Sequence, residues 1–90
     1  MNTNLENKST LASVKINWDS LLPAILLNFI QKGKGTRGMI QRKYCIGYVR
    51  TGIIIDQMVN AGFISKENEN DVNYKVLITK QDYQNIFENK

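Results

Sequence analysis

Apolar side chains recur at helical spacing in three successive runs through the middle of the chain. The first run predicts a helix over about residues 20–32, because its apolar positions share one face: Leu21, Leu22, Ile25, Leu26, Phe29 and Ile30. Asp19 or Ser20 is expected to be its N-cap, and Gly33 is expected to end it. The breadth of the apolar face predicts a buried helix.

The second and third runs predict two more helices separated by a short turn. Thr36 is expected to cap a helix over Arg37–Tyr44, and a further helix is expected from about Tyr48 to Ala61, with Gly62 as its C-cap. Between them, Cys45–Gly47 predicts a tight turn. Two helices joined by a short turn containing glycine are typical of a helix-turn-helix.

Beyond the third helix the apolar period becomes that of extended chain. Phe63–Ser65 and Tyr74–Ile78 are expected to be strands of a hairpin joined by a polar loop. Thr79 followed by Asp82 resembles a capping box and predicts a final helix through Phe87. The expected fold class is α/β, mainly α. It is a winged helix-turn-helix, with three helices, a β-hairpin wing and a short C-terminal helix.

The N-terminal residues are expected to lie outside this fold. Residues 1–17 are interpreted as a tail or arm, in which Leu11–Asn17 predicts a short strand or an extended arm. Residues 18–90 are interpreted as one winged-helix domain, with the helix-turn-helix at about 37–61 and the wing at about 63–78. The longest apolar run, LLPAILLNFI, is too short to cross a bilayer, and a cytoplasmic location is expected.

Positive charge is concentrated in one segment. The chain carries a formal net charge of +4, and no acidic residue lies between Asp19 and Asp56. Six positive residues fall within 32–50, which are Lys32, Lys34, Arg37, Arg42, Lys43 and Arg50. The basic field therefore coincides with the predicted helix-turn-helix, and double-stranded DNA is the expected partner.

The composition offers no candidate catalytic or metal site. There is no histidine and one cysteine, so a Cys–His nucleophile or a standard zinc site lacks its ligands. Cys45 is interpreted as a small core residue. The stretch Gly33–Thr36 lacks the spacing of a phosphate-binding loop and is interpreted as a helix stop followed by a flexible basic turn. No enzymatic activity, cofactor or metal is expected.

One face of the predicted third helix is expected to contact DNA. Thr51, Ile54, Ile55 and Met58, with Ile46 and Ala61 at the ends, form the stripe expected to be buried. Arg50, on the opposite face, is the best candidate for a bidentate guanine contact. The full set of expected DNA-binding residues is Lys34, Arg37, Gln41, Arg42, Lys43, Tyr48, Val49, Arg50, Ile53, Asp56, Gln57 and Lys75.

The stretch IQRKYCIGYVRTGIIIDQMVNAGFIS at residues 40–65 resembles the gamma domain of the DNA translocase FtsK, and the resemblance extends over about Asp19–Ile78. It implies a winged helix that binds short G-rich DNA sequences, and that also contacts a site-specific recombinase. A standalone domain without the motor is expected. The family reads bases through an asparagine and a second arginine, and these positions are Val49 and Ile53 here. Such side chains can contact thymine methyl groups but cannot hydrogen-bond to guanine, so the family's G-rich specificity is not expected to follow.

The sequence therefore leaves two functional hypotheses. The first is non-enzymatic binding of double-stranded DNA by a small transcriptional regulator, or by an accessory factor of a mobile element. The alternative is a protein-interaction module in which Val49 and Ile53 anchor a protein partner such as a recombinase or nuclease. Both a monomer and a homodimer remain open.

Overall fold

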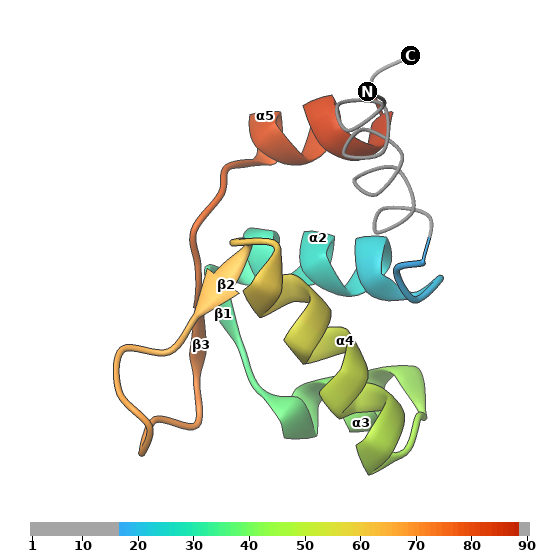
Figure 1. Ribbon diagram of the computed structural model, residues 1–90, viewed down its shortest axis with the longest axis vertical. Coiled ribbons are helices and arrows are strands. Elements are labelled where there is room, and N and C mark those ends of the chain that lie inside the picture. Colours follow the sequence, from blue (N-terminus) through green and yellow to red (C-terminus); the bar gives the residue numbers. More distant parts are fainter. Residues whose placement is uncertain (1–16, 89–90) are drawn as a thin grey trace, which may run out of the picture.

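The computed structural model describes residues 17–88 of the chain. Its elements are, in chain order, α2 (Leu22–Lys32), β1 (Lys34–Gly35), α3 (Arg37–Tyr44), α4 (Tyr48–Asn60), β2 (Ile64–Ser65), β3 (Tyr74–Val76), α5 (Lys80–Tyr83) and the π-helical turn η1 (Gln84–Glu88). Helix α2 lies between α5 and the α3–α4 pair, and the loop between β2 and β3 projects away from the helices (Figure 1). The predicted winged-helix fold is confirmed. The predicted tail and the arm at Leu11–Asn17 lie outside the described residues, apart from Asn17.

Helix α2 begins later than its sequence pattern predicts. The N-cap position is Leu21, and neither Asp19 nor Ser20 occupies it, so that prediction is wrong. Asp19 instead closes a preceding turn, in which its carboxylate accepts from the Leu21 N–H at 2.8 Å and its carbonyl accepts from the Leu22 N–H at 2.9 Å. Gly33 ends the helix in a left-handed conformation at φ 83°, as predicted.

The two helices of the helix-turn-helix have the predicted bounds to within one residue. The Thr36 hydroxyl accepts from the Met39 N–H at 3.1 Å and caps α3. Helix α4 ends in paired bonds typical of a Schellman motif, from the Gly62 N–H to the Val59 carbonyl at 3.0 Å and from the Phe63 N–H to the Met58 carbonyl at 2.9 Å.

Cys45 does not fill the core. It adopts a left-handed conformation, with φ 54°, at the end of α3. This backbone turns its side chain to the surface, so the residue is exposed and the interpretation as a core residue is wrong. Its thiol lies 3.8 Å from the Arg42 carbonyl, to which it donates.

The wing belongs to a three-stranded antiparallel sheet with the order β1-β3-β2. The predicted hairpin is present, with Ile64 opposite Val76. The third strand, β1, pairs Gly35 with Tyr74, so this part of the expected flexible turn is in fact a strand. Two residues are too few to show the alternating apolar pattern of a strand, so the sequence does not predict β1. Its pairing with β3 defines it.

The core lies where α2, α4 and the sheet meet. Its buried apolar residues are Leu22, Ile25, Leu26, Phe29, Ile40, Ile54, Ile55, Met58, Phe63, Ile64, Tyr74 and Tyr83. The predicted capping box of α5 is present, because the Thr79 hydroxyl accepts from the Asp82 N–H at 3.1 Å and the Asp82 carboxylate accepts from the Thr79 N–H at 3.0 Å. The C-terminal helix then packs Phe87 against Trp18, with ring centroids 5.5 Å apart.

Candidate nucleic-acid interface

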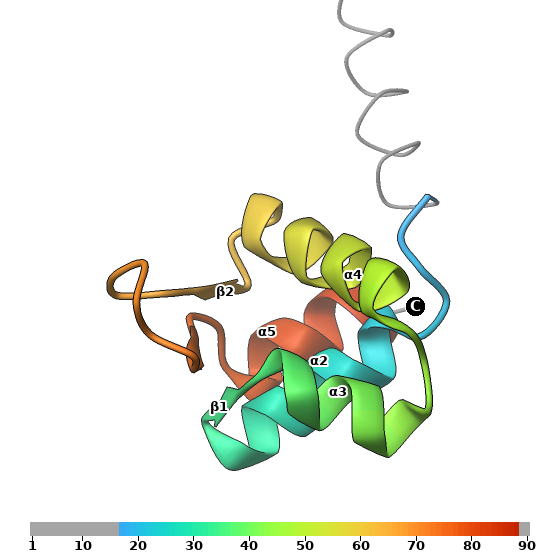
Figure 2. The ribbon, with the colours of Figure 1, turned by 90° about the horizontal axis from the view of Figure 1, so that it is seen from below.

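The candidate interface is the outer surface of α3 and α4, which lie side by side and are joined by the turn at residues 45–47 (Figure 2). An α-helix turns by about 100° per residue, so its buried stripe determines which residues face solvent. In α4 the buried stripe is Thr51, Ile54, Ile55 and Met58, as predicted. Ala61, expected at the end of this stripe, is exposed because it lies beyond the last helical turn.

Opposite the buried stripe lies a row of four exposed residues, Val49, Ile53, Asp56 and Asn60, which we call the α4 ridge. Val49 is 74% exposed and Ile53 is 49% exposed. These two side chains are one helical turn apart and make the N-terminal half of the ridge apolar. Arg50 and Gln57 lie on one flank of the ridge, whereas Tyr48 and Gly52 lie on the other.

Arg50 forms an ion pair with Asp19, a partner 31 residues away in the chain. Its Nε and Nη2 each donate to a different carboxylate oxygen at 2.9 Å. The Asp19 side chain is 14% exposed and the Arg50 side chain 46% exposed. The hydrogen bond from Arg50 lowers the pKa of Asp19 below its ordinary value of 3.8, and the same bond raises the pKa of Arg50. Asp19 therefore orients the Arg50 guanidinium, which the sequence predicts to contact guanine. Its Nη1 lies outside the ion pair.

Gln57 is also engaged with the segment that precedes α2. Its Oε1 accepts from the Asp19 N–H at 2.9 Å, and its Nε2 donates to the Asn17 carbonyl at 3.5 Å. Residues 17–19 therefore run along the flank of α4 that carries Arg50 and Gln57. Sequence reasoning missed this role of Asp19, for which the signal was an isolated acid at the edge of a long acid-free segment.

Arg37 joins the start of α3 to the other flank of α4. Its guanidinium carbon lies 5.5 Å from the centroid of the Tyr48 ring, a cation–π arrangement. A side chain at Gly52 would bring a Cβ to 3.2 Å from Arg37 Nη1. The group that lies close to Gly52 is therefore the Arg37 guanidinium.

The remaining cations of α3 lie at its C-terminal end. Arg42 and Lys43 are both exposed, in the last turn of the helix. Arg42 extends back along α3, because its Nη1 lies 3.1 Å from the position of a Cβ at Gly38. Gln41, also expected to contact DNA, is half-buried.

The two expected cations of the sheet are opposite each other but are next to acidic residues. Lys34 on β1 pairs in register with Lys75 on β3. Lys75 Nζ lies 3.2 Å from a Glu67 carboxylate oxygen, and this pair is well exposed. The wing loop also contains Glu69 and Asp71, so the tip of the wing carries more negative than positive charge.

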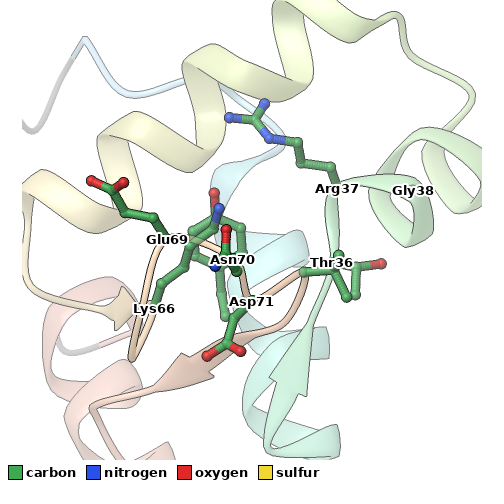
Figure 3. A pocket seen from close by; sticks show the side chains of 9 residues that line it. Thr36, Arg37, Gly38, Lys66, Glu69, Asn70 and Asp71 are labelled. Atoms are coloured by element: carbon green, nitrogen blue, oxygen red, sulfur yellow. The ribbon is translucent and has the colours of Figure 1, made fainter.

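A groove of about 560 Å³ separates the start of α3 from the wing loop. In Figure 3, Arg37 extends from α3 toward α4, while Glu69 and Asp71 come from the loop on the other side of the groove. Arg37 and Lys66 are the cations of the lining, so its positive and negative charges balance. The groove therefore has no net charge that would attract an anion. The outer face of α3 and α4, in contrast, carries net positive charge.

Residues 17–88 contain neither a metal-ligating cluster nor a helix that could span a membrane. No group of three His, Cys, Asp or Glu side chains in this range could hold a metal ion. Within the same range, every helix is too short or too polar to cross a membrane.

The chain matches a known protein family over most of its length. The family described as "Ftsk gamma domain" matches residues 17–79, which include the segment at residues 17–19, the helix-turn-helix and the wing. No curated protein matches the chain.

Proposed function

The chain belongs to the FtsK gamma domain family, a family of DNA-binding winged helices, and we propose that this protein binds double-stranded DNA through α3, the following turn and α4. The proposed function is binding and positioning, without catalysis. The observation that carries it is the concentration of cations around an exposed helix ridge. The DNA-binding residues predicted from the sequence remain predictions, and the exposure of Arg42, Lys43 and the α4 ridge supports them.

Charge on the helix-turn-helix favours a polyanion. Helices α3 and α4 contain four cations, Arg37, Arg42, Lys43 and Arg50, against the single acid Asp56. Asp19, which precedes α2, pairs with Arg50, and the surface still keeps a net positive charge. Double-stranded DNA carries one negative charge for about every 1.7 Å of its axis, so a surface of this kind gains affinity by releasing counterions from the duplex.

The cations and the ridge have separate roles in this proposal. Arg42 and Lys43, exposed at the end of α3, contact phosphates and position the domain without reading sequence. The α4 ridge enters the major groove, where its side chains meet the base edges. Lys34 and Lys75 contribute less, because Glu67 pairs with Lys75 and the acidic loop repels phosphate.

The experiment measures fluorescence anisotropy of a labelled duplex at increasing salt concentration. For the wild type, the logarithm of the association constant should fall linearly with the logarithm of the salt concentration, by about 0.9 for each phosphate contacted. Arg42→Ala/Lys43→Ala should weaken binding to every duplex and make this slope shallower by about one to two units.

A matched control separates position from net charge. Lys66→Ala/Lys80→Ala also removes two positive charges, one from the wing loop and one from α5. This control should change the slope little. If both double variants reduce the slope equally, net charge alone attracts DNA, and the proposed interface is wrong.

A second function is favoured by the exposure of Val49 and Ile53. On that hypothesis the α4 ridge anchors a protein partner, and DNA binding is incidental. Millimolar affinity for duplex at low salt, together with no effect of Arg42→Ala/Lys43→Ala, would favour it. Under the DNA-binding proposal the protein acts in the cytoplasm as a regulator or an accessory factor, as a monomer or a homodimer.

A further inference from the structure

The exposed part of α4 combines two properties that rarely occur together on a protein surface. Val49 and Ile53 are apolar and solvent-exposed, yet a guanidinium lies on each flank. Arg50, whose Nη1 lies outside its ion pair with Asp19, is on one flank, and Arg37 lies against Tyr48 on the other. Both apolar side chains are β-branched, so each has essentially one rotamer in a helix. They form a rigid apolar surface that loses little entropy on binding.

The flanking charge determines what can cover this apolar pair. An occupant that complements this surface carries negative charge around its edge and presents small apolar groups at its centre. The major groove of duplex DNA meets both conditions, since its only apolar base substituent is the C5-methyl group of thymine. Neither Val49 nor Ile53 has a donor or an acceptor, so neither can distinguish base pairs by hydrogen bonding.

We infer that Val49 and Ile53 select DNA sites by contacting the methyl groups of two nearby thymines. This inference rests on the proposed binding of double-stranded DNA and identifies the class of sequence bound. Side chains one helical turn apart have Cβ atoms about 5–6 Å apart, and successive bases of a strand are about 3.4 Å apart along the axis. The two thymines therefore lie on adjacent or next-but-one base pairs.

The preferred sites contain two thymines within three consecutive base pairs. Asp56, the next residue of the ridge, can accept a hydrogen bond from an amino group of cytosine or adenine but not from thymine. The class of site bound is therefore two thymines followed by a cytosine or an adenine as the base that faces Asp56.

The decisive experiment removes the methyl group and nothing else. Duplexes bound by the full chain are selected from a random pool, and each thymine of the selected site is replaced in turn by deoxyuridine. This change keeps the phosphates and every hydrogen-bonding group of the base. At two thymines the affinity should fall about four-fold each, which is the effect of burying one methyl-sized group. When each of these two T·A pairs is instead replaced by C·G, 5-methylcytosine should bind more tightly than cytosine at that position, because it restores the methyl group in the major groove.

Two protein variants connect the effect to the ridge. In Val49→Ala/Ile53→Ala, replacement by deoxyuridine should change affinity less than about 1.5-fold, because the shorter alanine side chains no longer reach the methyl groups. The salt slope should stay as in the wild type, since no cation is removed. Val59→Ala is the matched control, because Val59 is a partly exposed valine of α4 outside the ridge, and it should retain the deoxyuridine effect.

The outcomes separate this inference from the proposed function. If no thymine-containing site is enriched, or if deoxyuridine has no effect at any position while salt-dependent binding persists, the methyl contacts are wrong and duplex binding stands. If the wild type fails to bind duplex at low salt, both proposals are wrong. If Val49→Ala/Ile53→Ala keeps the full deoxyuridine effect, the methyl groups are read elsewhere and the assignment to the ridge is overturned.

Discussion

Replacing Gly35 by alanine should destabilise the protein through a collision with the core. Gly35 is buried in β1, and an added Cβ would lie 2.6 Å from Phe29 Cδ1 and closer still to Cε1 and Cζ. Carbon atoms that are not bonded approach to only about 3.5–4.0 Å without repulsion. Phe29 is fully buried, so its ring can move away only by displacing other side chains of the core.

The expected cost follows from the geometry. Forcing an extra methyl group into a packed core usually costs about 1–3 kcal/mol, and a contact this short favours the upper half of that range. For a domain of about 60–100 residues, each kcal/mol lowers the melting temperature by about 4–8 °C. Gly35→Ala should therefore lower it by about 10–20 °C.

Thermal unfolding followed by circular dichroism measures this shift. The fluorescence of Trp18 provides an independent probe, because this is the single tryptophan of the chain and its ring packs against Phe63 at a centroid distance of 5.4 Å. The two probes should give the same midpoint if the domain unfolds as one unit.

Gly38→Ala is the matched control. Its Cβ would contact only the end of the Arg42 side chain, at 3.1 Å, and this guanidinium is free to move. Because a glycine inside a helix costs about 0.5–1 kcal/mol relative to alanine, Gly38→Ala should stabilise the domain slightly.

A double variant tests the cause of the cost. In a Phe29→Leu background the ring is absent, so Gly35→Ala should cost at least about 1 kcal/mol less than it does in the wild type. A melting temperature of Gly35→Ala within about 2 °C of the wild type would refute the reasoning. An equal cost in both backgrounds would show that the ring is not the cause.

Three further predictions concern the interface and the C-terminal helix. Gly52→Ala should raise the melting temperature by about 4–8 °C, since it removes a glycine from α4, and should weaken duplex binding in anisotropy because the new methyl displaces the Arg37 guanidinium. Arg50 holds the folded pKa of Asp19 below 3.8, so the folded carboxylate binds fewer protons than the unfolded one. In urea titrations, the free energy of unfolding of the wild type should exceed that of Asp19→Asn by its full amount at about pH 6, and this difference should be lost as the pH falls below 3.8. Thr79→Ala should cost about 1 kcal/mol in the same titrations through loss of the α5 cap, whereas Thr79→Ser should not.

The helices and their ends are determined by residues that are close together in the sequence. The Thr36 cap of α3 and the capping box of α5 connect residues three apart. The buried stripe of α4 likewise follows from the 3.6-residue period. Local patterns therefore predict these elements, their order and the exposed ridge, and the family resemblance rests on the same residues.

Other features depend on residues that are distant in sequence. Strand β1 exists because it pairs with β3, about 40 residues later, and its two residues have no pattern of their own. Arg50 is paired because folding brings Asp19 to it across 31 residues, and Gln57 reaches the same segment across 38. An ion pair of this kind depends on the angle at which α2 meets α4. That angle is set by the packing of the whole core, so periodicity can show that Arg50 faces outward but not which side chain will meet it.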